Sequence, residues 1–202
     1  TGVNVDAFQR PACLPPPPYT GAIKGRPQAV YMGHLYDYKG IPSILEAAAH
    51  GRDIDFQLVG GRDEDVARVR GLVEEASLEN VFVHGRKSQS EIPPYLWHAD
   101  LLLLPPSLNH PSARWTSPVK LGEYLASGAP VVATSIPALR DWLSDHEVEF
   151  VTPDDGQALL AGIRRVLQEP ERASALSARG VALAKEWSYT ARARRILTAA
   201  GF

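Results

Sequence analysis

The sequence predicts a doubly wound α/β fold: a mostly parallel, Rossmann-like sheet with helices on both faces. Short apolar runs alternate with helix-like runs over residues 28–168. The short runs are continuously apolar, as in strands that are covered on both faces of a sheet. The intervening runs are long enough for the helical crossovers that join parallel strands.

The elements follow in a regular order along the chain. Strands are predicted at residues 29–32, 56–59, 81–83, 101–104, 131–133 and 149–151. Helices are predicted at residues 41–49, 63–76, 91–98, 117–127, 137–143, 157–168, 172–186 and 190–199. The acidic residues at the start of the 63–76 helix complement its dipole, and Ser117, Pro118 and Gly128 suit the N-cap, the first position and the C-terminal stop of the 117–127 helix.

Three parts are predicted along the chain. Residues 1–27 lack periodicity and contain four consecutive prolines at 15–18, so we expect an interdomain linker or an extended N-terminal segment without packed structure. Residues 28–187 form the Rossmann-like domain, and residues 188–202 form a C-terminal helix. The chain starts at Thr1 and Met32 is its only methionine, which leads us to expect a piece of a longer protein.

Composition excludes several classes of protein. The formal charge of −2 and the pI near 6.3 argue against nucleic acid as a partner. A lone cysteine, Cys13, precludes an intrachain disulfide and fits a reducing, cytoplasmic compartment. No apolar run is long enough to span a bilayer, and no signal peptide is evident.

Common metal and catalytic motifs are also missing. No His/Cys cluster has metal-ligand spacing. The D-x-D stretches at 53–55 and 63–65 are interpreted as a strand border and a first helical turn, not as metal motifs. Neither a G-x-G-x-x-G loop, a Walker phosphate loop nor a G-x-S-x-G elbow occurs. We therefore expect no bound metal, and dehydrogenase, NTPase and α/β-hydrolase functions are disfavoured.

The helix at 117–127 carries the most informative polar groups. Lys120, Glu123 and Ser127 are spaced to lie on one face, and the opposite face is apolar. The carboxylate of Glu123 can accept hydrogen bonds from two adjacent sugar hydroxyls. The alternative is a solvated Lys120–Glu123 pair with little energetic value.

In a doubly wound sheet, ligands bind beyond the carboxyl ends of the strands. The loops expected there are 33–40, 60–62, 85–90 and 105–117. The first opens a helix, so Lys39 and free backbone N–H groups are placed to bind phosphate. We expect the four loops to converge on one site.

Residues 123–134, EYLASGAPVVAT, and residues 33–40, GHLYDYKG, resemble motifs of the retaining GT-B glycosyltransferases of family 4, the glycosyl transferases group 1. The segments 58–61, 83–91 and 2–8 also resemble that family. The resemblance implies the C-terminal, nucleotide-sugar-binding half of a GT-B fold. It implies transfer of a sugar from a nucleoside-diphosphate sugar with retention, and no required cofactor or metal.

The resemblance also implies the site residues. Lys39, Glu123 and Lys120 are expected to be catalytic, and the expected donor-binding residues are Gly33, His34, Gly61, Gly85, Arg86, Thr116, Ser117, Val119 and Leu121. Two positions depart from the family pattern: His34 stands where the family has an arginine, and Trp115 stands where it has a first glutamate. These departures leave the phosphate contact of His34 and the bound sugar open.

The expected partners are a nucleotide-sugar and an N-terminal acceptor-binding domain of the same protein, without which the fragment is expected to be inactive. Arg192, Arg194 and Arg195 leave open a membrane-surface contact, an interdomain contact or a solvated face. Two alternatives remain: a GT-B-like sugar-nucleotide epimerase or phosphorylase, and a noncatalytic nucleotide-binding or interaction domain.

Overall fold

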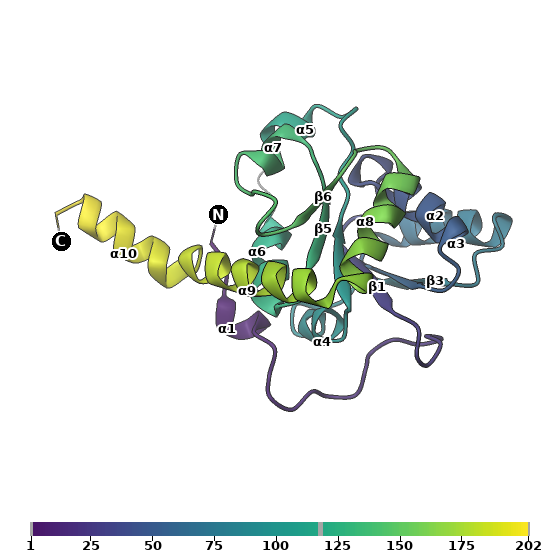
Figure 1. The fold of residues 1–202 in the computed structure, drawn as a ribbon, viewed down its shortest axis with the longest axis horizontal. Coiled ribbons are helices and arrows are strands. Elements are labelled where there is room, and N and C mark those ends of the chain that lie inside the picture. Colours follow the sequence, from purple (N-terminus) through teal and green to yellow (C-terminus); the bar gives the residue numbers. More distant parts are fainter. Residues whose placement is uncertain (1, 117–118, 202) are drawn as a thin grey trace.

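The computed structural model describes residues 2–116 and 119–201, and its centre is a six-stranded, all-parallel sheet (Figure 1). The strand order is β3-β2-β1-β4-β5-β6. The strands are β1 (Gln28–Met32), β2 (Asp55–Val59), β3 (Val81–Gly85), β4 (Leu101–Leu104), β5 (Val131–Thr134) and β6 (Glu149–Val151). The predicted doubly wound α/β class is confirmed.

The described helices connect and cover the strands. They are α1 (Val5–Phe8), η1 (Asp37–Lys39), α2 (Ile41–His50), α3 (Asp63–Glu75), α4 (Ile92–Trp97), α5 (Ser112–Trp115), α6 (Val119–Ser127), α7 (Pro137–Arg140), α8 (Gly156–Gln168), α9 (Pro170–Glu186) and α10 (Tyr189–Ala199). The predicted cap at Ser117 and Pro118 lies outside the described residues. Helix α7 is shorter than the predicted 137–143 helix, because turns replace it after Arg140.

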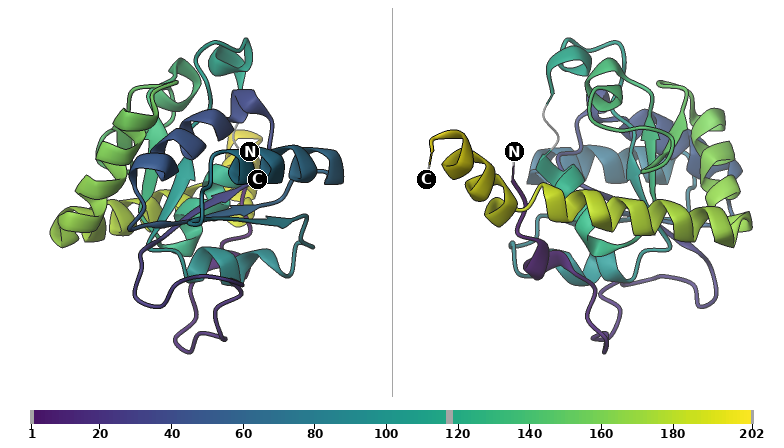
Figure 2. Two further views of the ribbon diagram at one scale, coloured as in Figure 1. Left: turned by 90° about the vertical axis from the view of Figure 1, so that its right-hand side faces the viewer. Right: turned by 60° about the vertical axis from the view of Figure 1, so that its left-hand side comes forward.

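Helices cover both faces of the sheet (Figures 1 and 2). A hydrophobic core lies between the sheet and the helices on each face. Side chains alternate along β1: Val30 and Met32 join the core under α4 and α6, whereas Ala29 and Tyr31 join the core under α2, α3 and α8. Helix α10 contributes no buried residue and projects beyond the rest of the fold (Figure 1). Burial on both faces explains why the strands are continuously apolar.

The N-terminal segment differs from the expected unpacked linker. Val3 and Phe8 are buried against α6 and its neighbours, and α1 forms where no helix was predicted. Residues 13–19 contain no helix or strand, as the prolines predict, but Pro15 still accepts a hydrogen bond from His98 (Nε2 to O, 2.7 Å). The segment therefore packs against the domain although residues 13–19 form no helix or strand. Its role as an interdomain linker stays a prediction.

Tyr19 provides a test of how firmly this segment is held. Its hydroxyl donates to the carbonyl of Tyr95, at 2.5 Å. We expect Tyr19→Phe to lower the free energy of unfolding by about 1 kcal/mol, the usual contribution of one hydrogen bond. Urea denaturation measures this effect, and an unchanged midpoint would show that the bond does not hold the segment.

A charged cluster fastens the edge strand β6 to two helices. The carboxylate of Glu149 is 1% exposed and accepts hydrogen bonds from Arg165 of α8 and, at 2.7 Å, from Nε of Arg172 of α9. Both arginines remain partly exposed. The cluster therefore joins the sheet to the α8–α9 corner through one buried anion.

Candidate functional site

A cavity of about 420 Å³ lies at the carboxyl ends of β1 and β4. The sheet order reverses between these two strands, and doubly wound proteins bind ligands at such a switch point. The cavity is lined by Tyr31, Gly33, His34, Lys39, Leu104, Pro106, Thr116, Val119, Lys120, Glu123 and Leu139.

Seven of the twelve predicted site residues line this cavity: Gly33, His34, Lys39, Thr116, Val119, Lys120 and Glu123. Gly61, Gly85 and Arg86 do not: Gly61 lies just after β2, and Gly85 and Arg86 lie at the end of β3, and these strands are one and two places away from β1. The side chain of Leu121 is buried in the core beneath α6, so only its backbone is left for a ligand. Ser117 lies outside the described residues.

Lys120 projects from the first turn of α6 toward the end of β1. Its Nζ atom donates to the hydroxyl of Tyr31 at 3.3 Å and lies 4.4 Å from the centre of the Tyr31 ring. Desolvation, reinforced by the positive charge of Lys39 and partly opposed by Glu123, lowers the pKa of Lys120 to about 7. Lys120 is therefore a cation whose charge responds to pH near neutrality and to an anionic ligand.

Gly33 makes room for this lysine. A Cβ atom on residue 33 would overlap Nζ of Lys120, and the φ angle of +145° is one that side-chain-bearing residues rarely adopt. The same turn is held by a hydrogen bond from the Gly33 N–H to the carbonyl of Val59, at 2.8 Å. The backbone conformation therefore favours glycine at residue 33, and a side chain there would displace the flexible end of Lys120.

Glu123 lies one turn further along α6, in the same cavity. Its Oε1 atom accepts a hydrogen bond from Nε2 of Gln89, at 3.2 Å. Burial raises the pKa of Glu123, and the Gln89 bond and Lys120 oppose that shift. Helix α6 is fixed against β1 because the hydroxyl of Tyr124 accepts from the N–H of Met32 at 2.7 Å.

Lys39 ends the short helix η1 in the loop after β1. Its Nζ atom lies 5.1 Å from the centre of the Tyr38 ring, and Tyr38 stacks on His110 with ring centres 4.0 Å apart. Burial lowers the pKa of Lys39. Arg68 braces the loop from outside by donating to the carbonyl of Leu35, at 2.5 Å.

His34 and Trp115, the two residues that depart from the family pattern, lie in different places relative to the cavity. His34 is exposed at the cavity rim, with its ring stacked on Tyr36 at 5.1 Å. Trp115 is 85% exposed at the end of α5 and is not among the lining residues. His34 is therefore placed to reach a cavity ligand, whereas Trp115 points elsewhere in this conformation.

Sequence reasoning missed several residues of the site. Tyr31 was counted only as part of an apolar strand, and Gln89 only as part of a loop. Leu104, Pro106 and Leu139 also form walls of the cavity. The sequence offered one signal for Tyr31: a side chain with a hydroxyl group occurs in an apolar strand whose carboxyl end was expected to lie at the site.

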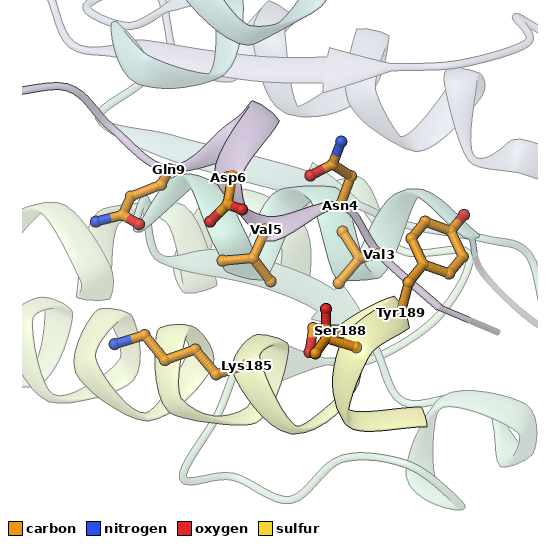
Figure 3. A pocket seen from close by; sticks show the side chains of 9 residues that line it. Val3, Asn4, Val5, Asp6, Gln9, Lys185, Ser188 and Tyr189 are labelled. Atoms are coloured by element: carbon orange, nitrogen blue, oxygen red, sulfur yellow. The ribbon is translucent and has the colours of Figure 1, made fainter. Parts of the chain in front are cut away.

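A second, smaller hollow of about 240 Å³ lies between the N-terminal segment and the α9–α10 junction (Figure 3). Val3 bridges these parts, with its N–H donating to Trp187 at 3.1 Å and its carbonyl accepting from Tyr189 at 3.2 Å. The hollow contains both charge signs, from Asp6 and Lys185. Figure 3 shows these two side chains coming from opposite walls.

Within residues 2–116 and 119–201, no group of three or more His, Cys, Asp or Glu side chains is arranged to hold a metal ion. Among the same residues, no helix has the length and apolarity needed to cross a membrane.

Comparison with known proteins assigns the class that this fold and cavity suggest. Residues 26–169 match the model of the glycosyl transferases group 1, so the chain belongs to that glycosyltransferase family. The predicted resemblance is confirmed at this level.

Two curated relatives are glycosyltransferases by name. The putative teichuronic acid biosynthesis glycosyltransferase TuaH of Bacillus subtilis (strain 168) is 27% identical over 176 residues, which cover 85% of this chain and 43% of the relative. The amylovoran biosynthesis glycosyltransferase AmsK of Erwinia amylovora is 29% identical over 143 residues, which cover 68% of this chain and 35% of the relative. This chain thus spans less than half the length of either relative.

Solved structures share the fold. Sucrose-phosphate synthase from Thermosynechococcus elongatus aligns with a TM-score of 0.77 and 25% identity, over 98% of this chain and 52% of that one. Anabaena HepE, solved with UDP and glucose, aligns with a TM-score of 0.78 and 16% identity, over 98% of this chain and 54% of HepE.

Proposed function

We propose that this chain is the donor-binding half of a longer glycosyltransferase that moves a sugar from a nucleoside-diphosphate sugar to an acceptor with retention. The observation that carries the proposal is the convergence of Lys39, Lys120 and Glu123 on one cavity at the switch point. The complexes of Anabaena HepE with UDP and with UDP-glucose support the choice of ligand class.

The proposed chemistry is stabilisation of the leaving group. Glu123 accepts hydrogen bonds from the ribose hydroxyls, and Lys39 and Lys120 face the diphosphate. As the bond to the sugar breaks, negative charge grows on the departing diphosphate, and two fixed cations in a partly desolvated cavity stabilise it. The lysines supply the positive charge themselves, so the proposal requires no metal or other cofactor.

The remaining parts of the proposal concern the longer protein. An N-terminal domain of the same protein would hold the acceptor and close the cleft, and this half alone would bind nucleotide without turnover. Attack on the same face of the sugar, a cytoplasmic location and a membrane contact through Arg192, Arg194 and Arg195 remain proposals.

The direct test is titration of this chain with UDP, GDP and ADP while backbone amide shifts are recorded. We expect at least one nucleotide to shift the amides of residues 33–40 and 119–123. No shift at those residues with any nucleotide would contradict donor binding and favour a noncatalytic interaction domain. A product assay on the full-length protein, following glycoside, sugar phosphate, free sugar and epimer, separates transfer from phosphorolysis and epimerisation.

Lys39 gives a kinetic test. We expect Lys39→Ala in the full-length enzyme to lose about 2 kcal/mol of transition-state stabilisation, roughly thirty-fold in kcat/KM, because one charged contact to the leaving group disappears. Release of nucleoside diphosphate measures the rate. Lys24→Ala, at an exposed lysine, is the control. Equal rates in both variants would remove Lys39 from the mechanism.

A further inference from the structure

Tyr31 is a polar residue at the end of an otherwise apolar stretch of β1. Only 1% of the surface of Tyr31 is exposed, but the residue still lines the cavity. Its hydroxyl donates to the backbone carbonyl of His34 at 2.6 Å and accepts from Nζ of Lys120 at 3.3 Å. The hydroxyl thus joins the loop after β1 to the lysine of α6.

The direction of these two bonds follows from the chemistry of the groups. An ammonium can only donate and a carbonyl can only accept, so the phenol must donate its proton to His34 and accept from Lys120. The Tyr31 ring adds an attraction for the cation, which lies 4.4 Å from its centre. Gly33, between the two partners, leaves the space that Nζ occupies.

A tyrosine that only filled the core would be equivalent to phenylalanine. Here the hydroxyl contacts two residues that both line the cavity, His34 and Lys120. We propose that Tyr31 is a positioning residue, whose hydroxyl holds the Lys120 ammonium and the 33–36 backbone in place for the diphosphate of the donor. The inference rests on the proposed function and adds a residue that acts through Lys120.

The arrangement makes binding depend on pH. The titratable groups around Lys120 are Lys39 and His34 from the loop after β1, Tyr31 from β1, and Glu123 and Tyr124 from α6 itself. With a pKa near 7, Lys120 is partly neutral in the free protein, and an anionic ligand favours its protonated form. Affinity for the donor therefore falls as the pH rises through 7. Removing the acceptor of Tyr31 lowers the pKa of Lys120 further and moves this fall to lower pH.

The experiment compares Tyr31→Phe with the unaltered chain, using UDP-glucose from pH 6 to pH 8. Neither the diphosphate nor the uracil of UDP-glucose titrates appreciably in that range, so the profile reports the protein. We expect roughly three- to ten-fold weaker binding at pH 7, the value of one hydrogen bond, and a fall in affinity that begins at lower pH. Tyr19→Phe, which removes a comparable hydroxyl-to-carbonyl bond far from the cavity, should leave the profile unchanged. Identical profiles for Tyr31→Phe and the unaltered chain would overturn the proposal.

A second readout separates this inference from the proposed function. Lysines labelled with ¹³C at Cε are titrated by NMR without nucleotide, and the Lys120 signal is assigned by its loss in Lys120→Met. We expect Lys120 to titrate at lower pH in Tyr31→Phe, and an unchanged titration would contradict the contact. If the titration shifts but the unaltered chain does not bind UDP-glucose, the proposed function is wrong and the positioning of Lys120 by Tyr31 stands.

Discussion

Replacing Glu149 with glutamine should lower the free energy of unfolding by about 2 kcal/mol, the largest effect on stability that we expect from one polar substitution. The carboxylate is 1% exposed and is held by Arg165 and Arg172. A hydrogen bond to a charged group contributes about 1.5–3 kcal/mol, and water compensates part of the loss because both arginines are partly exposed.

Urea denaturation gives the measurement. Glutamine keeps the volume of the side chain, removes its charge and replaces one of its two acceptor oxygens with an NH2 donor that would face an arginine. Glu171→Gln, at an exposed position on α9, is the matched control and should change stability by less than about 0.5 kcal/mol. A loss below about 1 kcal/mol for Glu149→Gln would show that the arginines do not depend on this anion.

Replacing Glu123 with alanine should weaken binding of the nucleotide by roughly a hundred-fold. Two hydrogen bonds from ribose hydroxyls to a carboxylate contribute about 3 kcal/mol together, and alanine removes both. Glu123→Gln keeps an acceptor oxygen and should lose roughly ten-fold. Because burial already raises the pKa of Glu123, affinity should also decline as the pH falls and the carboxyl is protonated.

Calorimetric titration of this chain with UDP measures these affinities, and Glu75→Gln on the exposed face of α3 is the control. A 2′-deoxy nucleotide provides an internal check, because it should bind the unaltered chain more weakly but bind Glu123→Ala with no further loss. If Glu123→Ala binds UDP as tightly as the unaltered chain, the carboxylate does not hold the ribose.

The sheet was predictable from the sequence because its strands are buried on both faces and read as continuous apolar runs. All six predicted strands and the long helices are present at nearly the predicted positions. The short helices α1, α5 and η1 were not predicted, because three or four residues show no periodicity and are held by tertiary contacts. The prolines correctly indicated an extended segment, but they carry no signal that it packs on the domain.

The site was predictable in part for a similar reason. Loops at the carboxyl ends of parallel strands share one edge of the sheet, so Lys39, Lys120 and Glu123 could be expected to meet. The order of the strands within the sheet was not predicted, and Gly61, Gly85 and Arg86, at the ends of β2 and β3, are not among the residues that line the cavity. The hydroxyl of Tyr31 escaped notice because its partners, Lys120 and the carbonyl of His34, are set by three-dimensional packing.

The close contact between Gly33 and Lys120 couples two positions that lie far apart in the sequence. A side chain gained at residue 33 would displace the flexible end of the lysine and would also have to adopt an unfavourable backbone conformation. Such a change should therefore disturb the placement of the Lys120 charge even where the chain still folds. Engineering that aims to alter the charge of this cavity has to treat residues 33 and 120 together.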